Sequence, residues 1–65
     1  MEKFGQKLRQ IRERSGLSQE QLANLCDLPA SQIGRIERGE LNTGISHVVL
    51  IAKVLNIHPK ELWDF

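Results

Sequence analysis

Apolar residues recur at helical spacing near the start of the chain. Phe4, Leu8 and Ile11 follow an i, i+4, i+7 pattern, and mostly lysine, arginine and glutamine occupy the positions between them. This pattern predicts an amphipathic helix over about residues 2–14 whose apolar stripe faces a core. Gly16 then supplies the left-handed stop that commonly ends a helix.

A second pattern covers residues 18–39 and consists of two short amphipathic segments with a break at positions 27–29. Ser18 followed by Gln21 forms a capping box, which predicts a helix over about residues 18–26. The apolar positions of this helix are Leu22, Ala23, Leu25 and Cys26.

Pro29 suits the start of another helix because it lacks a backbone N–H and has a fixed φ. This helix is expected over about residues 30–38, with Ile33 and Ile36 facing inward and Gly39 as its stop. Two helices joined by so tight a turn are the outline of a helix-turn-helix that reads DNA.

The last third of the chain is apolar on more than one side. Its spacing predicts a helix over about residues 45–55, although several of these residues are β-branched and by propensity alone favour a strand. Pro59 starts one more short helix, over about residues 58–63. The buried face of the longer helix is expected to consist of Ile45, Val48, Val49, Ala52 and Leu55, broadened by Ile51. Five helices in 65 residues predict an all-α fold class, a compact five-helix bundle.

The chain length fits one domain over residues 1–65, near the lower limit for a core without covalent bracing. The single cysteine, Cys26, cannot form an internal disulfide, and we expect it to be a small core residue in a cytoplasmic protein. No apolar run approaches the about 20 residues needed to cross a bilayer. We expect no membrane partner, no cofactor and no small-molecule ligand.

The sequence contains no catalytic or metal-binding pattern. His47 follows Ser46 without a glycine-rich elbow, and His47 and His58 lie too far apart along the chain for metal-ligand spacing. The carboxylates are scattered among basic residues rather than paired in apolar surroundings. The sequence therefore argues against an enzyme and against a metal site.

Charge alone decides little. The formal net charge is +1. Residues 1–39 hold seven basic and five acidic side chains, a net +2, whereas residues 40–65 hold two basic and three acidic side chains, a net −1. This polarity fits a DNA-facing side and a remote side, and an ordinary mixed surface explains charges this small equally well.

The outward side of the helix over residues 30–38 carries short polar groups and arginine. In the major groove, glutamine can pair with adenine, arginine with guanine, serine with either, and an alanine methyl can touch thymine. Gly34 lies on this side, where a missing side chain would let the helix approach a phosphate closely. A solvated helix face is the alternative interpretation, and the short turn to the preceding helix favours DNA. The residues concerned are Ala30, Ser31, Gln32, Arg35 and Arg38.

The start of the preceding helix is suited to an anion. Ser18, Gln19 and the free backbone N–H groups there are aimed where a phosphate would lie. Gln19 could hydrogen-bond that phosphate or a base at the edge of the site, and the alternative is a surface glutamine beside a cap.

Three separated runs of the sequence, LRQIRERSGLSQEQLA, IGRIERG and VVLIAKVLNIHPKELW, resemble one known family in register. Together they are similar to the helix-turn-helix domains of phage repressors and Cro proteins, the XRE-type family, from about Leu8 to Trp63. The resemblance implies a lambda-repressor-like domain whose third helix enters the major groove of double-stranded DNA.

The resemblance also implies roles for individual residues. Base contacts are implied for Ala30, Ser31 and Arg35, with Gln32 beside them. Phosphate contacts are implied for Gln19 and, around the end of the third helix, for Arg38, Asn42 and Thr43. Arg12 and Glu37 match a buried or half-buried pair, and a partner would relieve the burial of the Glu37 charge.

Three positions depart from the family pattern. Asp27 stands where the turn usually has glycine, Pro29 where a serine or threonine N-cap is common, and Thr43 where many relatives have proline. The first two bear on where the third helix begins, and therefore on which base each side chain meets.

These observations predict a sequence-specific DNA-binding transcription regulator that represses by occupying its operator. One domain of this size offers few contacts, so we expect a homodimer on a palindromic site. We expect Leu50 and Phe65 at the dimer interface, and Val49 and Trp63 in the core. The alternatives are an antitoxin or restriction–modification controller of the same fold, and a protein-interaction module without DNA affinity.

Overall fold

The computed structural model describes residues 2–40 and 44–63, and these residues form α-helices joined by short turns. The five helices in this part of the chain confirm the all-α fold class. Their bounds are Glu2–Arg14 for α1, Gln19–Cys26 for α2, Ala30–Glu37 for α3, Ile45–Val54 for α4 and Lys60–Trp63 for α5.

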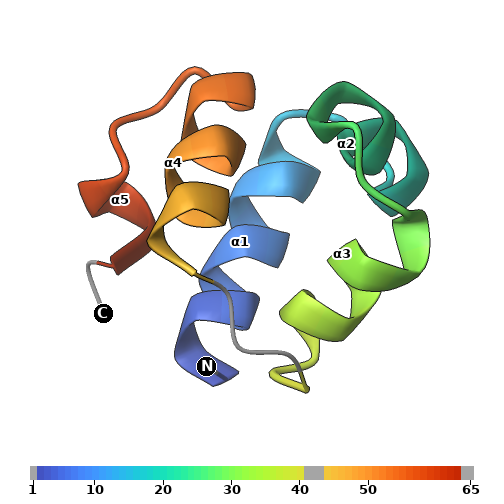
Figure 1. Cartoon of the computed structure of the whole chain (residues 1–65). Coiled ribbons are helices and arrows are strands. Elements are labelled where there is room, and N and C mark those ends of the chain that lie inside the picture. The colour runs from blue at the N-terminus through green and yellow to red at the C-terminus, as the bar shows by residue number, and fades with distance from the viewer. Residues whose placement is uncertain (1, 41–43, 64–65) are drawn as a thin grey trace.

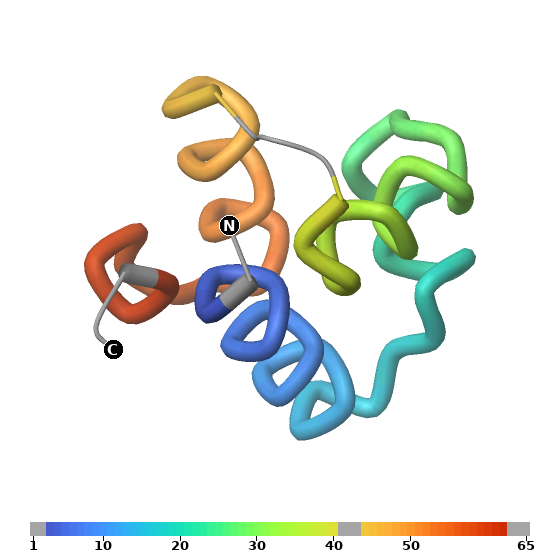
Figure 2. The backbone as a smooth tube through the Cα atoms, turned by 90° about the horizontal axis from the view of Figure 1, so that it is seen from below, coloured from blue at the N-terminus to red at the C-terminus, as the bar shows by residue number. Residues whose placement is uncertain are grey.

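The helix α1 runs through the middle of the molecule. Figure 1 shows α2 and α3 on one side of it and α4 and α5 on the other. In the view from below, α1 again lies between α5 and the α2–α3 pair (Figure 2). The helix α1 contacts α3 and α5, while α2 packs against α3 and also against α4. This arrangement leaves the outer side of α3 uncovered by the other described helices.

One apolar core joins all five helices. Phe4, Leu8 and Ile11 of α1 are buried, as their spacing predicted. Cys26 is 3% exposed and is the small core residue we expected. The other buried apolar residues are Leu22, Ala23, Ile33, Ile36, Val48, Ile51, Ala52, Leu55 and Leu62.

Four helices end on a residue with a left-handed backbone, which explains why the turns are so short. Gly16 and Gly39 have a φ of 75°, Asp27 of 57° and Asn56 of 59°. At each end the next N–H reaches back to a carbonyl of the last turn, as in a Schellman motif. The roles predicted for the glycines are confirmed, and Asp27 performs the same role in the turn where the family usually has glycine.

The predicted buried face of α4 was partly wrong. Ile45 is 71% exposed and Val49 is 47% exposed, whereas Ile51 is completely buried. The observed buried stripe is 48, 51, 52 and 55, which has the same i, i+3, i+4, i+7 spacing as the predicted stripe. Because the helix is apolar on adjacent sides, its periodicity fits either stripe, and packing against α2 selects one of them. The expectation that Val49 closes the core is therefore wrong.

Leu25 is a smaller correction. We counted it among the inward positions of α2, and its side chain is 60% exposed. The short helix buries Leu22, Ala23 and Cys26, so Leu25 lies on the far side of a narrow apolar stripe.

Candidate nucleic-acid interface

The turn between α2 and α3 is fixed by its backbone. The N–H of Asp27 bonds to the carbonyls of Ala23 and Asn24, and the N–H of Leu28 bonds to Ala23 at 2.9 Å. Pro29 is the N-cap residue of α3, with φ −64° and ψ 141°, and makes no side-chain capping bond. The helix nevertheless begins at Ala30, as predicted, because proline has the φ that a first helical turn needs.

The helix α3 separates its two sides as the sequence predicted. Ile33 and Ile36 are completely buried. Ala30, Ser31 and Arg35 are exposed. A row of short polar groups and one arginine therefore faces solvent from a helix whose other side is anchored in the core.

Gln32 and Gly34 are less exposed than the other residues predicted for this face. Gln32 is half-buried and Gly34 is buried. A Cβ atom at Gly34 would stand 3.4 Å from Oε1 of Gln19 and 3.1 Å from a guanidinium nitrogen of Arg38. The prediction that Gly34 lies on the open face is thus wrong, since side chains of α2 and of the α3 C-terminus lie across it.

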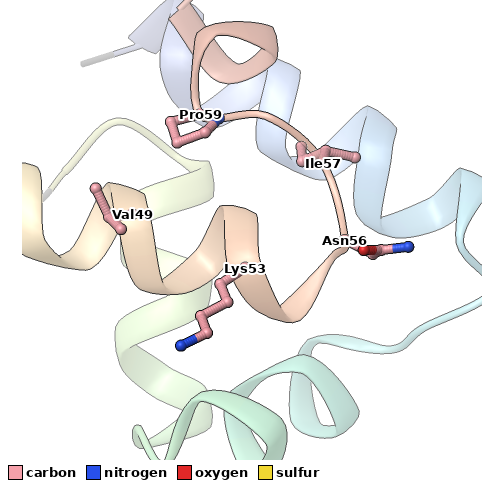
Figure 3. Close-up of a pocket in the computed structure, with 5 residues that line it drawn as sticks. All are labelled: Val49, Lys53, Asn56, Ile57 and Pro59. Carbon is pink, nitrogen blue, oxygen red and sulfur yellow. The ribbon is translucent and has the colours of Figure 1, made fainter.

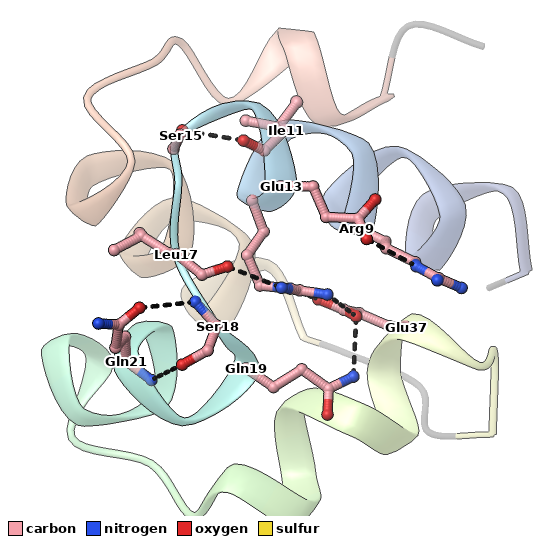
Figure 4. Close-up of polar contacts among 10 residues, drawn as sticks. Arg9, Ile11, Glu13, Ser15, Leu17, Ser18, Gln19, Gln21 and Glu37 are labelled. Carbon is pink, nitrogen blue, oxygen red and sulfur yellow. Dashed lines mark hydrogen bonds and ion pairs between the residues drawn. The ribbon is translucent and has the colours of Figure 1, made fainter.

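Gln19 has a partner within the protein. Its Nε2 donates a hydrogen bond of 3.0 Å to Oε1 of Glu37, and Figure 4 shows the amide reaching from the start of α2 to the end of α3. This contact orients the amide, because the nitrogen must face the carboxylate. The sequence gave no local signal for it, since the two residues are 18 positions apart.

The ion pair implied by the family resemblance is present and buried. Nε of Arg12 donates to Oε2 of Glu37 at 2.6 Å, and Nη2 donates to Oε1 at 3.1 Å. Arg12 and Glu37 are 8% and 7% exposed. The hydrogen bond to the Glu37 carboxylate raises the pKa of Arg12. Such a two-bond pair compensates both buried charges and ties α1 to the end of α3.

Arg12 also fixes the approach to α2. Its Nη1 donates to the carbonyl oxygen of Leu17 at 2.7 Å, immediately before the cap of α2. One guanidinium therefore positions the start of α2 and the end of α3 relative to α1. The carbonyl of Leu17, Gln19 and Glu37 gather around it (Figure 4).

The cap of α2 has the predicted geometry. Oγ of Ser18 accepts the N–H of Gln21 at 3.0 Å, and Oε1 of Gln21 accepts the N–H of Ser18 at 2.8 Å (Figure 4). The first N–H groups of the helix beside Ser18 face the same end of the molecule as the Gln19 amide. Of the other positions implied for phosphate contact, Asn42 and Thr43 lie outside the described residues, as does the Phe65 position implied for the dimer.

Arg38 is engaged by a neighbour that sequence reasoning missed. Its Nε donates to Oε2 of Glu40 at 2.7 Å, and the two side chains are 57% and 53% exposed. The hydrogen bond to Arg38 lowers the pKa of the Glu40 carboxyl, and the charge of Arg35 contributes in the same direction. An acidic residue two positions after Arg38, across a glycine, was the signal available in the sequence.

The rest of the described structure offers no competing chemistry. Among the residues whose placement is described, no group of three His, Cys, Asp or Glu side chains could hold a metal ion. No helix in the same part of the chain has the length and apolar character to cross a membrane.

A shallow apolar hollow lies away from α3, between α4 and the segment leading to α5 (Figure 3). Its volume is about 380 Å³. Val49 and Lys53 line it from α4, and Asn56, Ile57 and Pro59 line it from the following turn. The partly buried Leu50 packs against the nearby core.

Comparison with known proteins gives the same fold with a regulatory context. The family model HTH_3, described as Helix-turn-helix, matches residues 8–62. Control protein C.BamHI of Bacillus amyloliquefaciens is 49% identical over 63 residues, covering 95% of this chain and 78% of that protein. Control protein C.SmaI of Serratia marcescens is 40% identical over 59 residues, covering 91% and 70% respectively. The crystal structure of the restriction-modification controller protein C.AhdI from Aeromonas hydrophila matches with a TM-score of 0.90 and 47% identity, covering 92% of this chain and 91% of that one.

Proposed function

The chain belongs to the HTH_3 helix-turn-helix family, and from this membership we propose that it is a DNA-binding transcription regulator of a restriction–modification system. The two control proteins and the restriction-modification controller described above support this system over an antitoxin. The controller role was one of the alternatives that the sequence left open, and the named relatives move it to first place.

The proposed mechanism is readout of double-stranded DNA by α3 in the major groove. The observation that carries it is the exposed outer side of α3, with Ala30, Ser31 and Arg35 facing solvent over a buried Ile33 and Ile36. Arg35 would read guanine, with Ser31 and the half-buried Gln32 beside it and the Ala30 methyl against thymine.

The phosphates flanking this readout would be held from both ends of the helix pair. At the start of α2, the free N–H groups beside Ser18 and the oriented amide of Gln19 suit one phosphate. At the end of α3, Arg38 suits another, with Asn42 and Thr43 as the further contacts that the family resemblance implies. These contacts would position the domain without reading sequence.

We infer that two copies act together. A domain with one recognition helix makes few base contacts, and a two-fold palindrome lets a symmetric dimer double them. The exposed apolar side chains Ile45 and Val49 and the hollow beside Val49 lie on α4, away from the outer side of α3. Leu50, half-buried on the same helix, is the described residue that we assigned to the dimer.

Repression by operator occupancy is the regulatory sign we propose. A bound dimer covering a promoter excludes other proteins from it, and no part of this mechanism needs a second domain or an effector. A restriction–modification controller regulating its own operon fits the same mechanism.

The test is a selection of binding sites from random duplex DNA, followed by salt titration on the enriched sequence. We expect a palindromic enriched sequence and an affinity that falls steeply with salt. Absence of enrichment, or an affinity indifferent to salt, would overturn DNA binding and favour a protein-interaction module. In a reporter fused to the enriched site, lower expression supports repression, and higher expression refutes it.

A further inference from the structure

The guanidinium of Arg38 is already occupied on the edge best suited to phosphate. Its Nε donates to Oε2 of Glu40 at 2.7 Å and its Nη2 donates to Oε1 at 3.5 Å. Arginine binds phosphate through the same paired N–H donors that it uses for a carboxylate. Glu40 thus stands where a DNA phosphate would bind Arg38.

The backbone keeps Glu40 in this place. The N–H of Glu40 bonds to the carbonyl of Arg35 at 2.9 Å, and the N–H of Gly39 bonds to the carbonyl of Ile36 at 3.0 Å. With Gly39 at a φ of 75°, these two bonds form a Schellman motif that folds the chain back over the last turn of α3. Glu40 is therefore held beside Arg38 by the helix end as well as by the ion pair.

The other edge of Arg38 points toward α2. A guanidinium nitrogen, Nη1, lies 3.1 Å from the position of a Cβ at Gly34, and the Gln19 amide oxygen lies 3.4 Å from the same position. Arg38 therefore extends over Gly34 toward Gln19, the residue proposed to hold a phosphate at the start of α2. The space that Gly34 leaves open brings two proposed phosphate donors to one region of the surface.

A carboxylate in this region opposes DNA binding in two ways. It competes for the donors of Arg38, and it repels an approaching phosphate. An arginine that is neutralised by a carboxylate also releases fewer condensed cations from DNA than a free one. Arg35, whose charge acts on Glu40 as well, is subject to the same field.

We propose that Glu40 is an internal competitor of the DNA backbone for Arg38 and sets how strongly the protein binds DNA of any sequence. The inference rests on the proposed function. Because the competition concerns phosphates, Glu40 weakens operator and non-operator binding alike, and it holds down the large non-specific component that Arg38 would otherwise add.

The test compares Glu40→Gln with the wild type on two duplexes, the sequence enriched by selection and a random sequence of the same length. We expect the variant to bind both about tenfold more tightly at moderate salt, as a charge-assisted contact is gained. The slope of log affinity against log salt should steepen by about 0.9, the increment for one additional phosphate contact. Thermal unfolding of each variant checks that the fold is retained.

Two further variants separate this competition from a general charge effect. Glu61→Gln removes the same charge from α5, on the other side of α1, where the glutamine oxygen can still accept the N–H of His58. Glu40→Gln in an Arg38→Ala background should give no gain over Arg38→Ala alone.

Equal affinities for Glu40→Gln and Glu61→Gln overturn the proposal, and so does a gain that persists without Arg38. In both results the wild type still binds its enriched site, so the proposed function stands. A wild type that binds no duplex overturns both.

Discussion

Gly5 of α1 lies directly against the carbonyl oxygen of Ile36 in α3. A Cβ atom at Gly5 would overlap that oxygen and stand 2.6 Å from the carbonyl oxygen of Glu37. Both neighbours are backbone atoms, so no side-chain rotation relieves the overlap. Glycine at this position allows α1 and α3 to approach closely, and this contact lies next to the Arg12–Glu37 pair.

We therefore predict that Gly5→Ala destabilises the domain although alanine is the better helix former. Overpacking costs about 1–3 kcal/mol, and the gain in helix propensity offsets about 0.5–1 kcal/mol of it. Because backbone must move, we expect the free energy of unfolding to fall by about 2 kcal/mol. Urea unfolding followed by circular dichroism measures this change.

Gly34→Ala is the matched control for that measurement. At Gly34 the nearest atoms belong to the side chains of Arg38 and Gln19, at 3.1 and 3.4 Å, and these can rotate away. The control should be as stable as the wild type or more stable by up to about 1 kcal/mol. Equal losses in the two variants would show that the approach of α1 to α3 is not the cause.

The ends of the helices could be predicted because their signals are local. Ser18 with Gln21, and Gly16 and Gly39 after apolar runs, each act within a few residues of the helix they delimit. Asp27 was the doubtful position, and its left-handed φ of 57° shows that a short polar side chain can substitute for glycine there.

What the sequence could not predict depends on contacts between distant residues or on equivalent faces. The buried side of α4 was ambiguous because apolar residues occupy two adjacent stripes, so Val49 was misplaced. The Gln19–Glu37 hydrogen bond and the burial of Gly34 follow from how α2 crosses α3, which periodicity does not encode. Glu40 was near Arg38 in sequence, but its effect depends on the backbone turn at Gly39.

The buried pair predicts a strong asymmetry between single and double substitution. Arg12→Met leaves the carboxylate of Glu37 buried without its main partner, which should cost about 3–5 kcal/mol. A domain of this size has a total stability of roughly 3–10 kcal/mol, so the single variant should be largely unfolded at 25 °C or close to it. Circular dichroism and urea titration measure it.

The double variant Arg12→Met, Glu37→Leu should recover most of that loss, because it removes both charges from the interior. Gln19 loses its hydrogen-bond acceptor in this variant, and since it is half-buried it can bond to water instead. A double variant no more stable than Arg12→Met would show that the pair is not an independent unit.

Cys26 predicts a loss of stability at alkaline pH. Burial raises the pKa of its thiol, so the folded state keeps the proton longer than the unfolded state. The stability from this difference is complete below the ordinary thiol pKa of about 8.5 and is lost as pH rises through the folded pKa. Urea unfolding at several pH values above 8 should show a steeper decline for the wild type than for Cys26→Ala. Parallel declines in the two proteins would contradict the prediction.

Arg35 and Gln19 should differ in what they contribute to binding. Arg35→Ala removes a base contact and should cost about 1–3 kcal/mol on the enriched site while relaxing preference at one base pair. Gln19→Ala removes a neutral phosphate contact and should weaken all sequences similarly without changing the salt slope.

A repeat of the binding-site selection with each variant measures these effects. The Arg35→Ala consensus should lose information at one position of each half-site, whereas the Gln19→Ala consensus should match that of the wild type. Because Gln19 also bonds to Glu37, unfolding of Gln19→Ala is measured alongside, and only affinities of fully folded protein are compared. An altered consensus for Gln19→Ala would place its amide on a base at the edge of the site.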